Sequence, residues 1–299
     1  MALDRPDAFV DAPAASLPAR LAGSTVFRLG RGGFPIFSGT ILAIFILAGA
    51  LGPLIAPHVP TLVDLSHAML PPGANRSYPL GTDELGRDIL SRLLGGARVS
   101  LVVALSVVIL SGGLGLIVAL LAGYIGGRLD ALLMRLTDAA LAFPFILLAI
   151  VLAAIFGAST KNVIIIITLG GWASYARIIR SEVLSLKAQE FVIMAVVMGA
   201  GPGWIIRRHL IPNVTGSLLV LSTLQVGQAI LAEGTLSFLG IGVPAPAPSW
   251  GGMLADGVNY LVTAWWLPTL PGIALSLAVL ASNLMGDWLR TRNDPKRLR

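Results

Sequence analysis

The stretch that organises this chain is residues 190–213, EFVIMAVVMGAGPGWIIRRHLIPN, which lies between two hydrophobic segments. The sequence predicts two short helices here, interrupted by the glycines of residues 199–203. The second helix is predicted to be amphipathic, with WII at 204–206 followed by RRH at 207–209. We expect it to stop at Pro212, because a proline ring clashes with the preceding helical turn. This pattern favours a rigid knob that docks into a partner over a catalytic site.

The composition around this stretch indicates an integral membrane protein. The 299 residues are 56% hydrophobic and only 12% charged, with a mean hydropathy of +0.85, which is too apolar for a soluble domain of this size. The absence of cysteine excludes disulfides, thiolate metal sites and cysteine nucleophiles. The formal charge of +6 is interpreted as the placement of basic loops beside a lipid bilayer, and we expect no nucleic-acid partner.

The hydropathy pattern predicts an all-α protein with six transmembrane helices, because about 20 apolar residues cross a hydrocarbon core of about 30 Å. The predicted spans are residues 36–56, 101–122, 135–156, 163–180, 216–237 and 267–287. A rival seventh span over residues 191–206 is uncharged, but it is short and interrupted by Gly-Pro-Gly. We favour six spans.

The distribution of basic residues predicts that both termini are cytoplasmic. With six spans, most of the 21 Lys and Arg residues fall on the inside, whereas the loop over residues 241–264 has none. Trp265 and Trp266 would then lie at the outer interface and Trp288 at the inner one. This topology makes residues 1–34 a flexible cytoplasmic tail, 35–57 the first transmembrane helix, 58–98 an extracytoplasmic segment with a short helix, 99–289 a five-helix core and 290–299 a basic cytoplasmic tail.

The extracytoplasmic segment contains two acid-to-base pairs at a spacing of four. Asp83 with Arg87, and Asp88 with Arg92, would each meet on one helical face. We interpret residues 78–98 as a solvated helix that caps the membrane domain, with substrate contact and partner docking as alternatives.

Charged and small residues near the spans need a physical reason. Arg135 and Asp138 are three apart and are expected to pair at the inner start of the third span. Glu233 is expected near the outer face, with a proton-relay role as the alternative. The glycines at 112, 113 and 115 are expected to allow close helix packing, with a pore role as the alternative.

Several classes of function are disfavoured by the sequence. The spans carry no central chain of Asp, Glu or His of the kind used by ion-coupled carriers, and no GxxxxGK[ST] run could bind a nucleotide. The three histidines are divided between predicted outer and inner segments, so we expect no catalytic residues, no metal site and no cofactor in this chain. The energy source is therefore expected outside the chain, although an ion-coupled secondary carrier and a structural scaffold remain alternatives.

Residues 190–213 resemble the EAA loop of the inner-membrane permease subunits of binding-protein-dependent ABC importers. Ala195 and Gly199 stand at the hallmark positions, with Ile205 and Pro212 at the family spacing after them. The resemblance extends over about residues 36–299. This part of the chain is similar to the second (C-type) permease of the dipeptide, oligopeptide and nickel branch. It is carried by LGTDELGRDILSRLLGGARVSL from position 80, LSFLGIGVPAPAPSWGGML from position 236 and GDWLRTRNDPKRLR from position 286. Ile193 and Val196 stand where members of this family commonly carry charged side chains, and Met194 where they have alanine.

The resemblance implies a type I importer permease fold in the bacterial inner membrane, with residues 186–213 as a coupling loop that docks into a cytoplasmic ATPase. The loop residues to which it gives this role are Glu190, Met194, Ala195, Gly199, Ile205, Arg208, His209 and Pro212. The implied partners are a homologous second permease, two P-loop ATPase subunits that bind ATP and Mg²⁺, and an extracytoplasmic binding protein. The implied cargo is a di- or oligopeptide, with nickel as the competing cargo, and no residue is assigned to the substrate path.

Overall fold

The computed structural model describes residues 35–292, so the predicted tail over 1–34 and the end of the basic tail, residues 293–299, lie outside the described residues. The described part is helical, with two isolated β-bridges and no strand. Its long helices are α1 (Ile36–Ile55), α2 (Ile89–Leu120), α5 (Thr160–Lys187), α8 (Ile211–Phe238) and α10 (Trp266–Arg292). The shorter ones are α3 (Gly127–Ala142), α4 (Phe145–Phe156), α6 (Glu190–Val197), α7 (Pro202–Ile205) and α9 (Trp250–Val258).

Five helical stretches of the described chain are long and apolar enough to cross a membrane, and the bent pair α3 and α4 makes a sixth span if it counts as one. This agrees with the predicted all-α membrane fold. The rival seventh span is not a single helix, because residues 191–206 are divided between α6 and α7.

The third predicted span, residues 135–156, is wrong as one straight helix. Its two parts, α3 and α4, meet at an angle of 92°. Phe143 lies between them in an extended conformation and is followed by Pro144. A residue before proline is driven out of the helical region by the proline ring, so the break follows from the sequence Phe-Pro.

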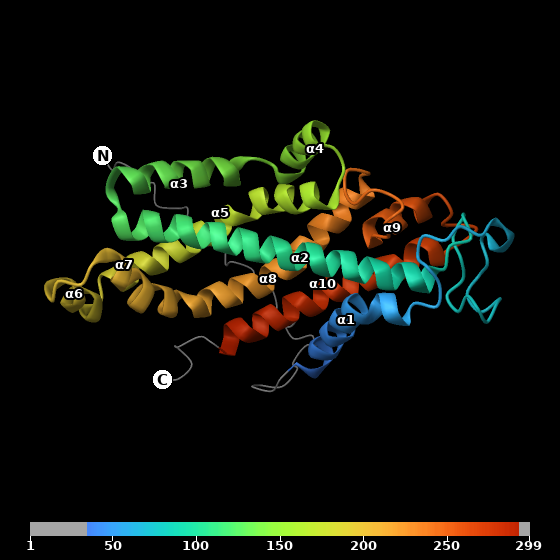
Figure 1. Ribbon diagram of the computed structural model, residues 1–299, viewed down its shortest axis with the longest axis horizontal. Coiled ribbons are helices and arrows are strands. Elements are labelled where there is room, and N and C mark those ends of the chain that lie inside the picture. The colour runs from blue at the N-terminus through green and yellow to red at the C-terminus, as the bar shows by residue number, and fades with distance from the viewer. Residues whose placement is uncertain (1–34, 293–299) are drawn as a thin grey trace, which may run out of the picture. The chain divides into compact units, whose positions relative to one another are not determined.

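The helices pack around α2, α5, α8 and α10 (Figure 1). α1 packs against α2 and α10, α3 lies along α5, and α9 contacts α8 and α10. α6 and α7 lie at one end of this assembly, whereas the loop over residues 56–88 lies at the other end with α9 (Figure 1). We call residues 190–205, which contain α6 and α7, the knob, and the region formed by residues 56–88 with α9 the far end.

Close packing between α2 and α5 depends on Gly115, as the glycine cluster predicts. A Cβ atom at Gly115 would lie 2.4 Å from the Cβ of Tyr175 and 2.8 Å from the carbonyl oxygen of Trp172. At Gly113 a Cβ atom would meet nothing within 4 Å. The cluster therefore has one position that sets the distance between helices and one that faces open space.

Replacing Gly115 with valine is expected to destabilise the chain by about 1–3 kcal/mol, because added methyl groups must push α2 and α5 apart. The measurement is the thermal unfolding midpoint of the purified chain in detergent. Gly113→Val is the matched control, since it adds the same side chain two residues away without a clash. Equal midpoints for the two variants would contradict this packing role.

The far end does not contain the predicted solvated helix over residues 78–98. α2 begins at Ile89, and Asp88 precedes it as the N-cap, where its carboxylate accepts a hydrogen bond from the amide of Ser91 at 2.9 Å. The predicted pairing of Asp88 with Arg92 is therefore wrong, and Arg92 bonds to Asp83 instead. The expected pair of Asp83 and Arg87 is present at 2.7 Å, but in a buried turn.

Trp266 also differs from expectation. It is buried, and its indole Nε1 donates to the carbonyl oxygen of Thr82 at 3.2 Å, so it holds α10 to the far-end loop. Its neighbour Trp265 is exposed, as an interfacial indole would be.

The two acidic residues of α3 bond to arginines of α5. Asp138 pairs with Arg177 and Asp130 pairs with Arg180, so the predicted pair of Arg135 and Asp138 is wrong. The physical reason is that α3 lies along α5, where two arginines face it from another helix. Glu233 is fully buried in α8, where its carboxylate accepts hydrogen bonds from Ser100 at 2.9 Å and Ser237 at 2.8 Å.

Candidate functional site

The knob begins with α6, whose end is closed by a Schellman motif. Gly199 has a φ of +85°, its amide donates to the carbonyl of Val196, and the amide of Ala200 donates to the carbonyl of Ala195. Glycine adopts this left-handed backbone without steric cost. The hallmark spacing of Ala195 and Gly199 therefore has a structural meaning, because both residues belong to the motif that stops α6.

The knob is held by three fully or nearly fully buried side chains. Val192 comes from α6, Ile205 from α7 and Leu210 from the π-helical turn that follows α7. They pack into one apolar cluster with residues of α2, α5 and α8, namely Ala119, Leu120, Tyr175, Ile179, Val183 and Val214. The knob is thus attached to three membrane-spanning helices at once, which suits an element that transmits movement.

One further contact fixes the shape of the knob, and a second holds the helix that leads into it. The ring of His209 lies between those of Phe191 and Trp204, with centroid distances of 5.5 Å and 5.0 Å, and so connects α6 to α7. The ammonium group of Lys187, at the end of α5, donates to the carbonyl oxygen of Tyr124 at 2.6 Å and so ties α5 to the end of the α2 stretch. The contacts of Phe191 and Lys187 were not predicted. The sequence carries a signal only for Phe191, which is aromatic.

The outward face of the knob is apolar. Ile193, Met194 and Val196, which depart from the family pattern, are 49%, 59% and 54% exposed, and Val197 and Met198 are 75% and 83% exposed. The side chains at 193, 194 and 196 therefore do not pack beneath the spans. Exposed apolar patches of this kind mark surfaces that meet a partner.

The chain leaves the knob without the predicted stop at Pro212. Helical structure is continuous from Pro202 to Phe238, with a π-helical turn over Ile206–Leu210 ahead of α8. Pro212 falls in the first turn of α8. Pro212 directly follows the π-helical turn, and a local π adjustment accommodates a proline within a helix, so the expectation that it ends the helix is wrong.

The structure divides the eight predicted loop residues into two groups. Ala195, Ile205 and His209 are buried or partly buried and hold the knob together. The exposed ones are Glu190, Met194, Gly199, Arg208 and Pro212. Glu190 lies in the first turn of α6, where a carboxylate is favoured by the helix dipole.

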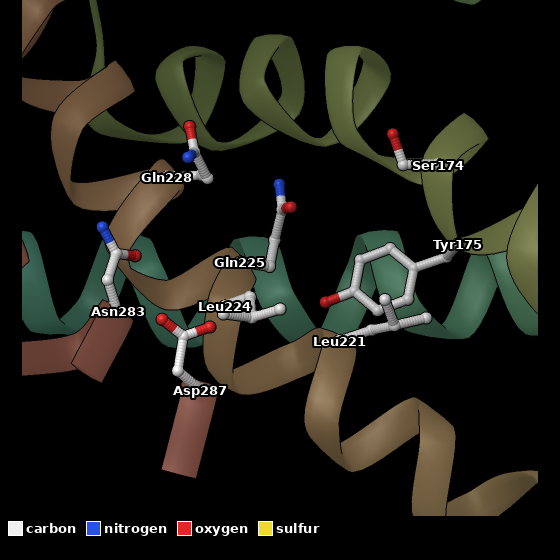
Figure 2. A pocket seen from close by; sticks show the side chains of 8 residues that line it. All are labelled: Ser174, Tyr175, Leu221, Leu224, Gln225, Gln228, Asn283 and Asp287. Atoms are coloured by element: carbon white, nitrogen blue, oxygen red, sulfur yellow. The ribbon is translucent and has the colours of Figure 1, made fainter. Parts of the chain in front are cut away.

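A cavity of about 380 Å³ lies between α5, α8 and α10 (Figure 2), and its lining shares Tyr175 with the apolar cluster at the base of the knob. It is lined by Ser174, Tyr175, Leu221, Leu224, Gln225, Gln228, Asn283 and Asp287. Figure 2 shows these side chains projecting from three helices around a common space. Its size is that of a small-molecule site.

The cavity was not predicted, although the sequence carries a signal for it. Gln225 and Gln228 are three apart on α8, and Asn283 and Asp287 are four apart on α10, so each pair lies on one helical face. Polar side chains inside apolar helices face the protein interior or water, and they often mark a path for a solute.

A model of the family described as binding-protein-dependent transport system inner membrane component matches residues 115–299. The chain is similar to a dipeptide transport system permease of Bacillus subtilis, 39% identical over 257 residues that cover 86% of this chain and 79% of the relative. It is 40% identical over 259 residues to a di/tripeptide transport system permease of Pseudomonas aeruginosa, covering 85% of this chain and 86% of the relative.

A nickel transport system permease of Escherichia coli is 42% identical over 255 residues, which cover 85% of this chain and 91% of the relative. Relatives named for peptides and for nickel thus match at similar identity, as the resemblance implied. The residues matched by the family model include the knob, the cavity and helices α5, α8 and α10. The comparisons confirm the predicted family, the inner-membrane location and the role of a transport subunit. The chain belongs to the inner-membrane permease components of binding-protein-dependent ABC importers, in the branch that contains the peptide and nickel permeases.

Proposed function

We propose that this chain forms half of the translocation path of an ATP-driven importer for di- or oligopeptides. A homologous second permease supplies the other half, an extracytoplasmic binding protein delivers the peptide, and two cytoplasmic ATPases that bind ATP and Mg²⁺ provide the energy. In this topology both termini and the knob are cytoplasmic, and the far end faces the binding protein. The placement of the knob and the far-end loop at opposite ends of the helices supports that assignment (Figure 1).

The observation that carries the proposal is the form of the knob, with an exposed apolar face on a buried base. Met194 and Val197 are more than half exposed, whereas Val192 and Ile205 are at most 1% exposed. A partner groove that covers the outward face can therefore move the base, and with it the ends of α2, α5 and α8. Rigid-body displacement of packed helices is a common form of such coupling.

Peptide is proposed as the cargo because two relatives are named for dipeptides or di/tripeptides and because the cavity is lined by amides. Gln225, Gln228 and Asn283 can each donate and accept hydrogen bonds, as a peptide group does. Nickel is the second candidate, since a relative 42% identical is named for it. Uptake assays of the assembled importer with labelled dipeptide and with radioactive nickel, in parallel, separate the two cargoes.

Replacing Met194 with glutamate is expected to reduce the amount of ATPase that co-purifies with the permease by about tenfold, because a buried contact at an interface is lost and a charge is desolvated. The measurement is the ratio of ATPase to permease after affinity purification from membranes. Val262→Glu is the control, since Val262 is 99% exposed and follows α9 near the far end.

Undiminished ATPase binding by Met194→Glu would contradict docking through the apolar face. Gradient-driven uptake by the chain alone, in vesicles without ATPases, would instead support the secondary-carrier alternative. A scaffold without a transport role predicts normal peptide uptake in cells that lack the chain.

A further inference from the structure

The cavity between α5, α8 and α10 contains polar groups that the described chain leaves without partners. Within residues 35–292, the side chains of Gln225, Gln228 and Asn283 make no hydrogen bond, and Asp287 makes no salt bridge. Unsatisfied polar groups in a membrane domain are costly unless water or a ligand reaches them. These groups therefore face a hydrated space and are available to a solute.

The backbone around the cavity is shaped to make room for two of these amides. The Nε2 atom of Gln225 would be 2.9 Å from a Cβ atom at Gly171, and the Oδ1 atom of Asn283 would be 2.6 Å from one at Gly227. A larger residue at either glycine would push the amide away. The amides thus occupy places that the neighbouring helices leave free for them.

The charge of the lining is of one sign. Asp287 is the one ionisable carboxyl group among the lining residues, and no Lys, Arg or His is among them. It is exposed, near the end of α10, and it has no described counter-ion. A cleft with a single uncompensated charge concentrates ions of the opposite sign.

We propose that this cavity is a cargo-binding subsite of the translocation path and that Asp287 makes it favour positively charged peptides. This rests on the proposed function as a peptide permease. Gln225, Gln228 and Asn283 hydrogen-bond the peptide groups, Leu221 and Leu224 contact apolar side chains, and the carboxylate attracts an ammonium or guanidinium group. The binding protein selects which peptides arrive, and the cavity adds a preference for charge.

The first test compares uptake of Ala-Lys and Ala-Asp by the assembled importer in vesicles. Asp287→Asn is expected to lower the ratio of Ala-Lys to Ala-Asp uptake by about tenfold. Because the same binding protein serves both variants, its own selectivity cancels when their ratios are compared. Glu182→Gln is the matched control: it removes a carboxylate from α5 outside the cavity and should leave the ratio unchanged. An unchanged ratio in Asp287→Asn, or an equal loss for both peptides, overturns the proposal.

The second test measures the charge preference without transport. The natural chain has no cysteine, so Gln228→Cys introduces one thiol into it. In the importer assembled with partner chains whose own cysteines are replaced, a cationic methanethiosulfonate should modify that thiol about tenfold faster than an anionic one. Adding Asp287→Asn should abolish the difference, and excess Ala-Lys should slow the modification.

Leu280→Cys is the control for labelling, because Leu280 lies on α10 outside the cavity. Failure of Gln228→Cys to react would mean that the second permease fills the cavity, and equal rates for the two reagents would mean that Asp287 exerts no field there. Either result overturns the proposal. Absence of peptide uptake by the natural chain, with the labelling as expected, would instead count against the proposed cargo.

Discussion

Replacing Asp83 with alanine is expected to lower the free energy of unfolding by about 3–5 kcal/mol, because removing one partner of a buried ion pair leaves the other charge uncompensated. The Asp83 carboxylate accepts from Arg87 Nε at 2.7 Å and also bonds to Arg92. All three side chains are at most 8% exposed. Without Asp83, the one carboxylate left near Arg92 among residues 35–292 would be that of Asp256, at 3.9 Å.

The measurement is the thermal unfolding midpoint of the purified chain in detergent. Glu84→Ala is the matched control, since Glu84 is the adjacent acid, is 24% exposed and bonds only to Arg87 among the described residues, at 3.0 Å. Its loss is expected to cost less than about 1 kcal/mol. Asp83→Asn should cost less than the alanine variant but more than the control, because its amide oxygen can still accept from the backbone amides of Leu85 and Arg87 while the charge that balances the arginines is lost. Equal effects of the Asp83 and Glu84 variants would contradict a buried network centred on Asp83.

The Gly199→Val variant is expected to insert normally and to retain its ATPases, but to take up peptide at least about tenfold more slowly. A β-branched residue at a φ of +85° costs about 1–2 kcal/mol or more, and the Schellman motif that ends α6 would rearrange. The knob would then still bind the groove of the ATPase. It would no longer hold α2, α5 and α8 in the arrangement that links ATP hydrolysis to peptide uptake. The measurement is the ratio of peptide uptake to ATP hydrolysis in the same vesicles, and this ratio should fall.

Gly203→Val is the control within the same knob. Gly203 is exposed in α7, its φ is outside the left-handed region, and a Cβ atom there would meet nothing within 4 Å. It should keep a normal ratio of uptake to hydrolysis. If Gly199→Val also kept that ratio, the closed end of α6 would have no part in coupling.

Features that depend on local chemistry could be predicted from the sequence. The apolar runs predicted the long helices, the glycines after Met198 predicted the break between α6 and α7, and the family spacing identified Ala195 and Gly199. Backbone conformation at a glycine, helix length and hydropathy are set by neighbouring residues, so a single sequence carries them.

Features that depend on distant partners could not be predicted in this way. Acidic residues were assigned to arginines nearby in sequence, but Asp138 pairs with Arg177 on another helix, 39 positions later. Asp83 bonds to Arg92 across nine positions, because the chain turns ahead of α2 and buries both side chains. A charge pairs with the opposite charge that folding brings to it, and the helical spacing alone does not specify which one.

The sequence by itself determined that this chain is a multi-span membrane protein with a knob of the importer-permease type, because apolar length, glycine placement and motif spacing are local properties. Only the tertiary structure decided what each part of that knob does: Val192 and Ile205 are buried against three helices, whereas Met194 faces outward. It also brought Gln225 and Asp287 to one cavity. Burial and convergence are consequences of how helices far apart in sequence pack, and no local pattern specifies that packing.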